Sequence, residues 1–464
     1  MSWRIRMNVV SSIRHLNHSW NKPRIQFNLI DSMSQQRKMT YQCANMKRSL
    51  SKEITSSITV EKKKHKSSTE SPSFVLVCGQ NICGQLGLST NIIERRKPQY
   101  LKIVNNFNID ENIQSIYAGG MHSCALTITG HVYTWGCNDD GALGRITDDI
   151  DDEYMPGLFV LPEEIKSICA GDTFTVALAK SGRAYISGCF RSSEGILGLF
   201  EYKQIVQKPI MIQLNQTIKQ IACGADFCLL LTENGSILCL KAKNECDLYS
   251  FGNNEIGQLG RDAHLEIKDN FSIWLRPCQI LSFQEQNILN IWAGGHGFFA
   301  LTQNSAIHLY ACGANSFGQL GHPSKQPIYS PVEIQGFPCL DKIIKISCGL
   351  QHTLILDSMG YVYGVGRSDD GRLGNNLVND IIIPKQINNL TNIFDIAAGG
   401  SVSFVINQNA QIYSFGMGDT CQIGHSNEDI FIPTLVKSKQ LERRNIQHIS
   451  VGAQHTLFLV KEER

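Results

Sequence analysis

Apolar and polar residues alternate in short runs that recur along most of the chain. The segment AGGMHSCALTITGHVYTWGCNDDGALG at 118–144 has a close counterpart, CGLQHTLILDSMGYVYGVGRSDDGRLG, at 348–374. In the first segment, HSCALT and HVYTW alternate apolar and polar positions and are rich in β-branched and aromatic residues, which predicts strands. The glycine between the runs, Gly130 or Gly360, stands where a tight hairpin needs a positive φ.

This unit occurs seven times. Its first half begins at Gly119, Gly171, Gly224, Gly294, Gly349, Gly399 and Gly452, and its second half is anchored at Gly79, Gly136, Gly188, Gly252, Gly313, Gly366 and Gly416. Repeats of about 50 residues made of short strands predict an all-β propeller, in which each unit needs its neighbours to cover its apolar faces. Seven copies predict a seven-bladed β-propeller.

The two ends of the chain complete one another. The last first half, VGAQHTLFLV at 451–460, has no second half after it, and the first second half, FVLVCGQNICGQLG at 74–87, has no first half before it. We expect both to join in one blade, which closes the ring and leaves no long open strand edge. An open array with two frayed ends is the alternative.

Charge divides the 464 residues into two regions, 1–72 and 73–464, although the formal net charge is only +2. Residues 1–72 carry 14 Lys and Arg against 4 Asp and Glu, whereas the remainder carries 29 against 37. A basic N-terminal extension therefore precedes an acidic propeller, and the contrast predicts partners of opposite charge for the two regions.

The extension has two parts. Residues 46–72 are polar, Ser-rich and without hydrophobic periodicity, which predicts disorder, and they contain two basic clusters: Lys47 and Arg48, then Lys62, Lys63, Lys64 and Lys66. This layout suits a bipartite nuclear import signal or a DNA-binding arm, and a merely solvated tail is the alternative. Residues 1–45 have the composition of a mitochondrial presequence, or of an upstream extension that is not part of the protein.

Several classes of chemistry find no support in the sequence. The 16 Cys follow no C-x-x-C spacing, which argues against zinc. Cys169, Cys223 and Cys348 recur at one repeat position, where we expect small buried thiols and not a disulfide. The pattern shows no apolar run long enough for a membrane helix, no P-loop, no G-x-S-x-G and no His pair at helical spacing. We expect no metal, no cofactor and no catalytic residues, and therefore a binding platform.

Because the two strands of each unit are antiparallel, both Gly-rich loops of every blade emerge on one face, where variable loops on a rigid scaffold are expected to bind partners. Equivalent loop positions hold His122, His352 and His455, which either contact a partner or cap the loop internally. Asp172 and Asp226 break the repeat, which favours a functional role over the alternative of a turn-stabilising one.

One loop departs from all the others. GCFRSSEGILGLFE at 188–201 replaces forms such as GCNDDGALG and is expected either to act as a wedge against a partner or to be a drifted surface turn. The long step between Gly224 and Gly294 contains an insertion around 239–246 and a long loop at 261–277.

These segments, with the closing VGAQHTLFLVK, resemble the regulator of chromosome condensation family over about 74–461. The resemblance implies a nuclear, chromatin-associated seven-bladed propeller that exchanges guanine nucleotide on the small GTPase Ran without covalent chemistry. It implies a wedge at Phe190–Gly195 and a GTPase-binding set on the Gly-loop face: Asp172, Asp226, His122, His352, His455, Phe190, Arg191, Ser192, Ser193, Glu194, Glu201 and Arg261.

The same resemblance implies partners for the rest of the molecule. Arg276 and the basic tail match parts that engage the histone dimer of the nucleosome and DNA, and the tail also fits a nuclear import receptor. No membrane partner is expected. Ile82 stands where the family has an acidic residue, and Phe174 and Phe227 replace His. A non-exchange adaptor propeller of the same superfamily is the main alternative, and a mitochondrial relative is another.

Overall fold

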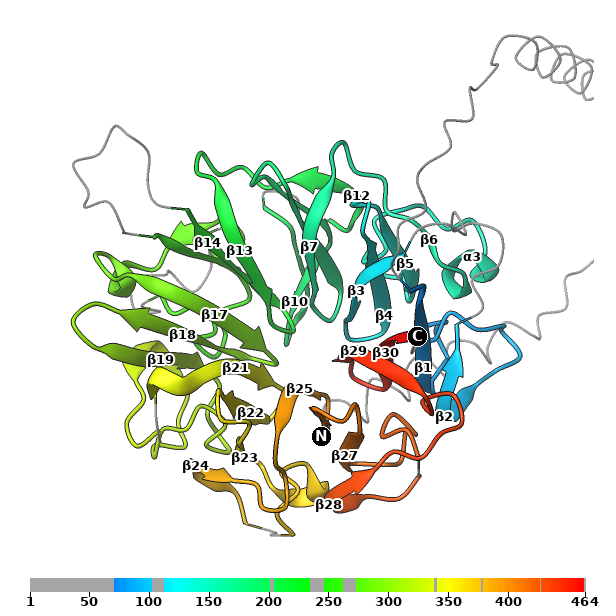
Figure 1. Cartoon of the computed structure of the whole chain (residues 1–464). Coiled ribbons are helices and arrows are strands. Elements are labelled where there is room, and N and C mark those ends of the chain that lie inside the picture. Colours follow the sequence, from blue (N-terminus) through cyan, green and yellow to red (C-terminus); the bar gives the residue numbers. More distant parts are fainter. Residues whose placement is uncertain are drawn as a thin grey trace, which may run out of the picture. The chain divides into compact units, whose positions relative to one another are not determined.

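Each repeat folds into a four-stranded antiparallel sheet. The computed structural model describes residues 71–101, 112–200, 204–233, 246–261, 273–337, 340–376, 379–425 and 427–462, all within the unit Glu70–Arg464. Seven such sheets surround a central channel, with their innermost strands β29, β3, β7, β13, β17, β21 and β25 nearest the axis (Figure 1). The predicted all-β, seven-bladed propeller is confirmed.

The blades run from inner to outer strand as follows. They are β29 (Arg444–Val451), β30 (His455–Glu462), β1 (Ser73–Gln80), β2 (Glu94–Tyr100); β3 (Ile113–Ala118), β4 (His122–Thr127), β5 (Val132–Gly136), β6 (Gly157–Leu158); β7 (Ile165–Ala170), β8 (Phe174–Ala179), β9 (Ala184–Gly188), β12 (Val206–Met211); β13 (Ile218–Cys223), β14 (Phe227–Thr232), β15 (Leu248–Gly252), β16 (Cys278–Gln279); β17 (Ile288–Gly294), β18 (Gly297–Gln303), β19 (Ile307–Gly313), β20 (Ile328–Glu333); β21 (Ile343–Cys348), β22 (His352–Asp357), β23 (Val362–Gly366), β24 (Ile381–Gln386); and β25 (Ile393–Gly399), β26 (Val402–Asn407), β27 (Ile412–Gly416), β28 (Ile430–Leu435). We number these blades 1 to 7 in this order.

The two strands that the sequence predicts in each unit are the middle pair of the blade. In blade 2 they are β4 and β5, and every residue of both is buried. Burial on both faces follows from packing between two neighbouring blades, so the polar side chains of β4 are enclosed together with the apolar ones. The inner and outer strands were not predicted separately, and outer strands such as β12 are half-exposed.

The ring closes through both termini, as predicted. Strand β1 pairs with β30 in an unbroken register from Ser73 opposite Lys461 to Gly79 opposite His455. At the adjoining seam, His448 Nδ1 of β29 lies 3.2 Å from Asp395 Oδ2 of β25. Blade 1 therefore has no free interior edge.

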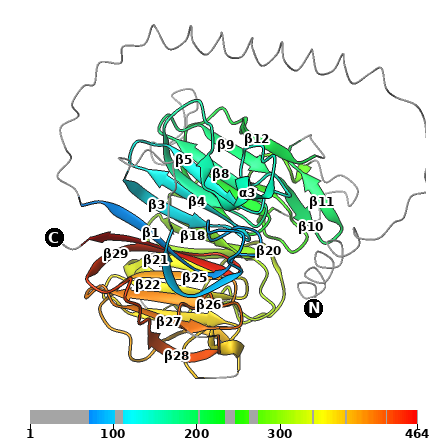
Figure 2. The same ribbon diagram turned by 90° about the vertical axis from the view of Figure 1, so that its right-hand side faces the viewer.

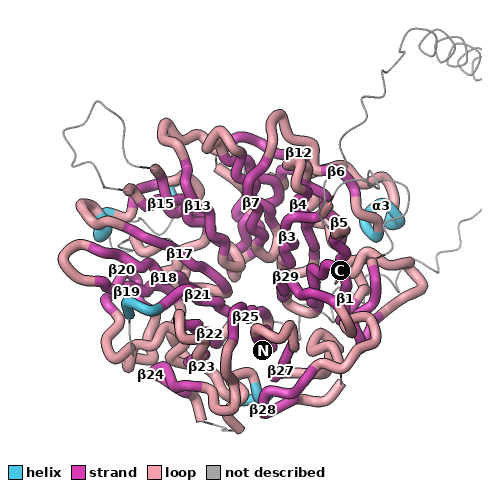
Figure 3. Tube along the Cα trace, viewed as in Figure 1, coloured by secondary structure: helices cyan, strands magenta, loops and turns pink. Residues whose placement is uncertain are grey.

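Helical structure is sparse in the described residues (Figure 3). The helix α3 (Ile150–Tyr154) lies between β5 and β6, where Asp149 accepts a hydrogen bond from the amide of Asp152 as an N-cap. Short 3-10 turns are η3 (Leu281–Phe283), η4 (Leu340–Lys342) and η5 (Asp369–Gly371). Of the helices that the structure describes, none is long and apolar enough to cross a membrane.

The prediction that the repeated cysteines are all free thiols is wrong for one pair. Cys169 at the end of β7 and Cys223 at the end of β13 form a disulfide with their Cα atoms 5.8 Å apart, whereas Cys348 is free. The repeat places these two residues at the same height on adjacent inner strands, so their side chains meet across the gap between blades 3 and 4.

Candidate functional site

The Gly-rich loops gather around one mouth of the central channel. This face, the Gly-loop face, holds the loops between first and second strands and between third and fourth strands of every blade, as predicted from antiparallel pairing. The channel encloses about 350 Å³ and is lined by the inner strands and by the Gly loops of all seven blades.

Main-chain hydrogen bonds tie these loops to one another around the mouth. They run between successive blades: Gly120 N to Gly171 O (3.1 Å), Asp172 N to Ala225 O (2.8 Å), Ala225 N to Gly295 O (2.7 Å), Leu350 N to Gly400 O (3.2 Å) and Ala453 N to Gly120 O (3.3 Å). The backbones come this close because glycines leave no side chain between them. A Cβ on Gly120, for example, would lie 2.9 Å from the Cα of Asp172.

The three repeat histidines lie beneath this mouth and are buried. Each ring nitrogen Nε2 lies 2.9 Å from a hydroxyl of the next blade: His122 with Thr175, His352 with Ser403, and His455 with Ser123. Burial lowers the pKa of His122 to about 4 and that of His352 and His455 to about 3, with neighbouring Arg372 lowering His352 further. The arrangement matches the internal-cap alternative, and any effect of these residues on a partner has to pass through the loops above them.

In the blades that carry a ring at this position, the type of ring matches the residue opposite, although Gly297 and Val402 also face hydroxyls, of Thr353 and Thr456. In blades 3 and 4 the equivalent residues are Phe174 and Phe227, and the next blade there presents Cys228 and Phe298 in place of a hydroxyl. Phe174 packs in one apolar cluster with Cys228, and Phe227 packs in another with Phe298. A histidine therefore occurs in this ring only where the next blade supplies a hydroxyl.

Asp172 and Asp226 lie on the Gly-loop face in blades 3 and 4, and both are half-buried. Asp172 lines the mouth of the channel. Asp226 Oδ1 accepts a hydrogen bond from the amide of Arg191 at 3.1 Å. Of the two acids that break the repeat, Asp226 therefore contacts the loop that departs most from it.

That loop forms a separate two-stranded hairpin, β10 (Phe190–Ser192) and β11 (Gly195–Gly198), which pairs with no blade. Figure 2 shows β10 and β11 at one margin of the propeller seen from the side. Phe190 and Ser192 are buried, whereas Ser193 and Glu194 are exposed and Ile196 is 45% exposed. The exposed edge suits contact with a partner, so the geometry fits the wedge alternative.

Phe190 anchors the base of the hairpin. Its ring packs edge-on against Phe174 of blade 3, with centroids 4.7 Å apart, and against Phe251 of blade 4, at 5.5 Å. Because the ring is fully buried, Phe190 fixes the hairpin and does not itself offer a contact surface.

Three polar residues that the sequence did not single out also touch the hairpin. Asp140 Oδ1 and Oδ2 receive Arg191 Nη2 and Nε at 2.6 and 2.9 Å, and Asn253 donates to the carbonyl of Arg191 at 2.9 Å. Glu255 accepts from the amide of Ser193 at 2.9 Å and from its hydroxyl. All three lie in the outgoing loops of blades 2 and 4, so a blade-by-blade alignment of the repeats would have placed them beside the wedge.

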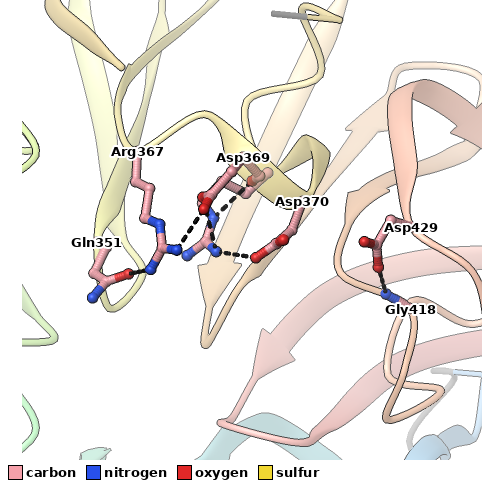
Figure 4. Close-up of polar contacts among 7 residues, drawn as sticks. Gln351, Arg367, Asp369, Asp370, Gly418 and Asp429 are labelled. Atoms are coloured by element: carbon pink, nitrogen blue, oxygen red, sulfur yellow. Dashed lines mark hydrogen bonds and ion pairs between the residues drawn. The ribbon is translucent and has the colours of Figure 1, made fainter. Parts of the chain in front are cut away.

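The outgoing loop of blade 6 is stiffened by its own charges. Arg367 Nη1 donates to Gln351 Oε1 at 2.6 Å and pairs with Asp369, as Figure 4 shows. The buried Arg372 pairs with Asp370, with Nη2 and Oδ2 2.5 Å apart. In blade 7, Asp429 likewise accepts from the amide of Gly418 at 2.9 Å (Figure 4). These acids stabilise their own loops.

A second surface is basic. Where blades 7 and 1 meet at the outer rim, a groove of about 650 Å³ is lined by residues of β2 and of the 437–442 segment, including Arg95, Lys97, Lys437, Lys439 and Glu442. Lys97, Lys437 and Lys439 are exposed. Four cations against one acid make this groove attractive to a polyanion, in contrast to the net negative charge of the propeller.

The remaining predicted contact residues are dispersed. Arg261 donates to the carbonyls of Ile273 and Trp274, at 3.3 and 3.4 Å, and so ties the two ends of the long loop. Arg276 is exposed in a groove of about 820 Å³ beside β12. Glu201 and the tail residues Lys47, Arg48, Lys62, Lys63, Lys64 and Lys66 lie outside the described residues.

Within the part of the chain that the structure describes, no three His, Cys, Asp or Glu side chains lie close enough together to hold a metal ion. The Gly-loop face offers hydrogen-bonding loops, acids and a projecting hairpin. These features define a class of protein, a seven-bladed propeller with its Gly-rich loops gathered on one rigid face.

Comparison with known proteins gives the family. Residues 74–458 match the RCC1-like domain, and the chain belongs to that family. It is 34% identical over 411 residues to the regulator of chromosome condensation of Homo sapiens, covering 86% of this chain and 93% of that protein. It is 29% identical over 401 residues to the guanine nucleotide exchange factor SRM1 of Saccharomyces cerevisiae, covering 75% of this chain and 79% of that protein.

Solved structures of a yeast protein named RCC1 (Prp20) support the same family assignment. The crystal structure of Prp20p from Saccharomyces cerevisiae, described with its binding to Gsp1p and histones, superposes with a TM-score of 0.76 at 27% identity, covering 86% of this chain and 93% of Prp20p. The structure of Kap60 bound to yeast RCC1 (Prp20) gives the same TM-score at 25% identity, covering 88% of this chain and 96% of that one.

Proposed function

We propose that this protein is a guanine-nucleotide exchange factor that docks the small GTPase Ran on its Gly-loop face. The observation that carries the proposal is the β10–β11 hairpin, a rigid projection fixed between blades 3 and 4 with an exposed tip. Relatives named as exchange factors and regulators of chromosome condensation match nearly the whole propeller, which supports the same role here.

The mechanism requires no bond breaking. A small GTPase holds its nucleotide through P-loop amides, a lysine and Mg²⁺. A propeller that binds the nucleotide-free form more tightly than the loaded form weakens nucleotide binding by the same factor, and each ~1.4 kcal/mol of that difference is tenfold in affinity. The hairpin, pressed against the nucleotide-binding loops, and Asp172 at the channel mouth supply such differential contacts.

The basic surfaces extend the proposal to chromatin. The groove with Lys97, Lys437 and Lys439 suits a phosphate backbone, and the basic clusters of the tail suit DNA and a nuclear import receptor. The binding of Prp20p to histones supports a histone partner, for which Arg276 is a candidate contact. We therefore propose that the protein acts in the nucleus on chromatin.

The direct test is release of fluorescent GDP from purified Ran by catalytic amounts of the full chain. Acceleration at substoichiometric protein supports an exchange factor. If a folded propeller binds Ran but leaves the release rate unchanged, the exchange function is rejected and an adaptor role takes its place.

A further inference from the structure

We propose that Asp140, Asp226 and Glu255 are positioning residues that hold the β10–β11 hairpin in its working orientation, and that Asp226 acts on the GTPase through this hairpin. The inference rests on the proposed exchange function and names the side chains that make the wedge effective. It assigns roles to Asp140 and Glu255 and changes the role expected of Asp226.

The hairpin cannot fix its own position. Its strands have three and four residues and pair only with each other. A lone two-stranded hairpin is marginally stable in water. Contacts from the blades therefore have to decide where it points.

Anchors reach the hairpin from both neighbouring blades. Below the base, Phe190 is locked between two aromatic rings. In the middle, Arg191 is held at three points: its guanidinium by Asp140 of blade 2, its amide by Asp226 and its carbonyl by Asn253, both of blade 4. Such bidentate and charge-assisted contacts are the stronger kind of hydrogen bond and impose a direction as well as a distance.

Of the three carboxylates, Glu255 is the one that contacts the tip of the hairpin. It receives the amide and the hydroxyl of Ser193, and Asn253 Nδ2 donates to Glu255 Oε2 at 3.0 Å. Burial acts to raise the pKa of Glu255, but the hydrogen bonds from Ser193 and Asn253 leave it below the usual value. Glu255 is therefore ionised at neutral pH and keeps its acceptors available for the tip.

The anchored side and the exposed side of the hairpin are different. The carboxylates all approach from the propeller, whereas a Cβ on Gly195 would meet no atom within 4 Å and Glu194 is exposed. A partner can therefore reach the tip without displacing an anchor. Because the hairpin is ordered before it meets the GTPase, less conformational entropy is lost on contact.

The role of Asp226 follows from what its carboxylate binds. Oδ1 accepts from the amide of Arg191, so this oxygen serves the hairpin. Asparagine retains an oxygen acceptor at that point but lacks the charge. If Asp226 positions the hairpin, Asp226→Asn preserves most of the exchange activity that Asp226→Ala loses. If Asp226 acts by its charge on Mg²⁺ or phosphate, both variants lose it equally.

The experiment measures GDP release from Ran with the full chain and its variants across a range of Ran concentrations. We expect Asp226→Ala and Glu255→Ala to lower kcat by about tenfold with KM within about twofold, because they remove a contribution made after docking. Asp226→Asn and Glu255→Gln should recover most of kcat. Glu333→Ala, which removes the partner of His308 on the outer strand of blade 5, is the control and keeps wild-type kinetics.

A second pair of variants tests whether Asp226 acts through the hairpin. In a chain lacking Ser193 and Glu194, Asp226→Ala should cause no further loss, because residues that act as one unit are not additive. An undiminished loss there, or Asp226→Asn as slow as Asp226→Ala, overturns the proposal.

Hydrogen exchange of the 190–198 segment separates this proposal from the exchange function itself. Faster amide exchange of that segment in Asp226→Ala and Glu255→Ala supports the anchoring even if wild-type protein fails to act on Ran. Unchanged protection in both variants rejects the anchoring, whatever the kinetics show.

Discussion

Nε2 of His122 in blade 2 lies 2.9 Å from Oγ1 of Thr175 in blade 3, and this contact fixes the protonation of the ring. The Thr175 hydroxyl donates its proton to the carbonyl of Ala142 at 2.8 Å, so towards His122 it can only accept. His122 therefore carries its proton on Nε2. Ser403 and Ser123 donate in the same way to Arg372 and Gln85, which imposes this neutral form on His352 and His455.

Acid should loosen the propeller through these rings. His122 has a pKa of about 4 in the fold because of burial, against about 6.5 in an unfolded chain. As the pH falls below 6.5, His122 binds a proton in the unfolded chain but stays neutral in the folded chain until about pH 4. The free energy of unfolding therefore decreases. For His122 alone the unfolding constant should rise about 20-fold between pH 7 and pH 5.

Substituting the residue that the chain uses elsewhere tests this pH effect. His122→Phe copies Phe174 and Phe227 at the equivalent positions and should fold. Urea unfolding at pH 7 and pH 5 should show a smaller loss of stability in the variant than in the wild type. An identical loss in both proteins would contradict a buried neutral His122.

Removing the base of the wedge should cost stability, whereas trimming its exposed edge should not. Phe190→Ala leaves a cavity among buried rings and should destabilise by about 3–5 kcal/mol. Ile196→Ala, at a side chain that is 45% exposed, should change stability by no more than about 0.5 kcal/mol. Thermal denaturation of the two variants beside the wild type measures the contrast, and equal Tm values for both would refute the anchoring of Phe190.

Asp172→Ala should slow GDP release from Ran without unfolding the ring. The side chain is half-buried at the channel mouth, and the inter-blade bond there uses the amide of Asp172, which alanine retains. We expect a loss of about tenfold in kcat/KM, equivalent to ~1.4 kcal/mol of transition-state binding. Normal exchange by a folded Asp172→Ala protein would remove this acid from the site.

The basic groove should bind DNA through its phosphates. Lys97→Gln and Lys439→Gln should each reduce the slope of log affinity against log salt by about 1, for any DNA sequence. The matched control is Lys325→Gln, since Lys325 pairs with Asp380, with Nζ and Oδ2 2.7 Å apart, outside the groove. Fluorescence anisotropy with a short duplex at several salt concentrations gives the slopes, and equal slopes in all variants would exclude the groove as a DNA contact.

The sequence by itself determined the architecture. Seven copies of one alternating pattern, four of them with a glycine at the hairpin, determine a ring of similar sheets, and the unmatched halves at 74–87 and 451–460 determine how it closes. This was possible because a repeat constrains its own neighbours: each blade can be covered only by another copy of itself. Both Gly-rich loops fall on one face because the two strands between them are antiparallel.

Only the tertiary structure decided what individual loop residues do. The pattern left His122, His352 and His455 between partner contact and internal cap, and the structure places each ring against a hydroxyl of the next blade, 53, 51 and 332 residues away in the chain. It gave no reason to single out Asp140 or Glu255, whose roles depend on where Arg191 and Ser193 lie in space. It also missed the Cys169–Cys223 disulfide. Contacts between blades join residues far apart in the chain, so local patterning carries the fold, while the site depends on which side chains the closed ring brings together.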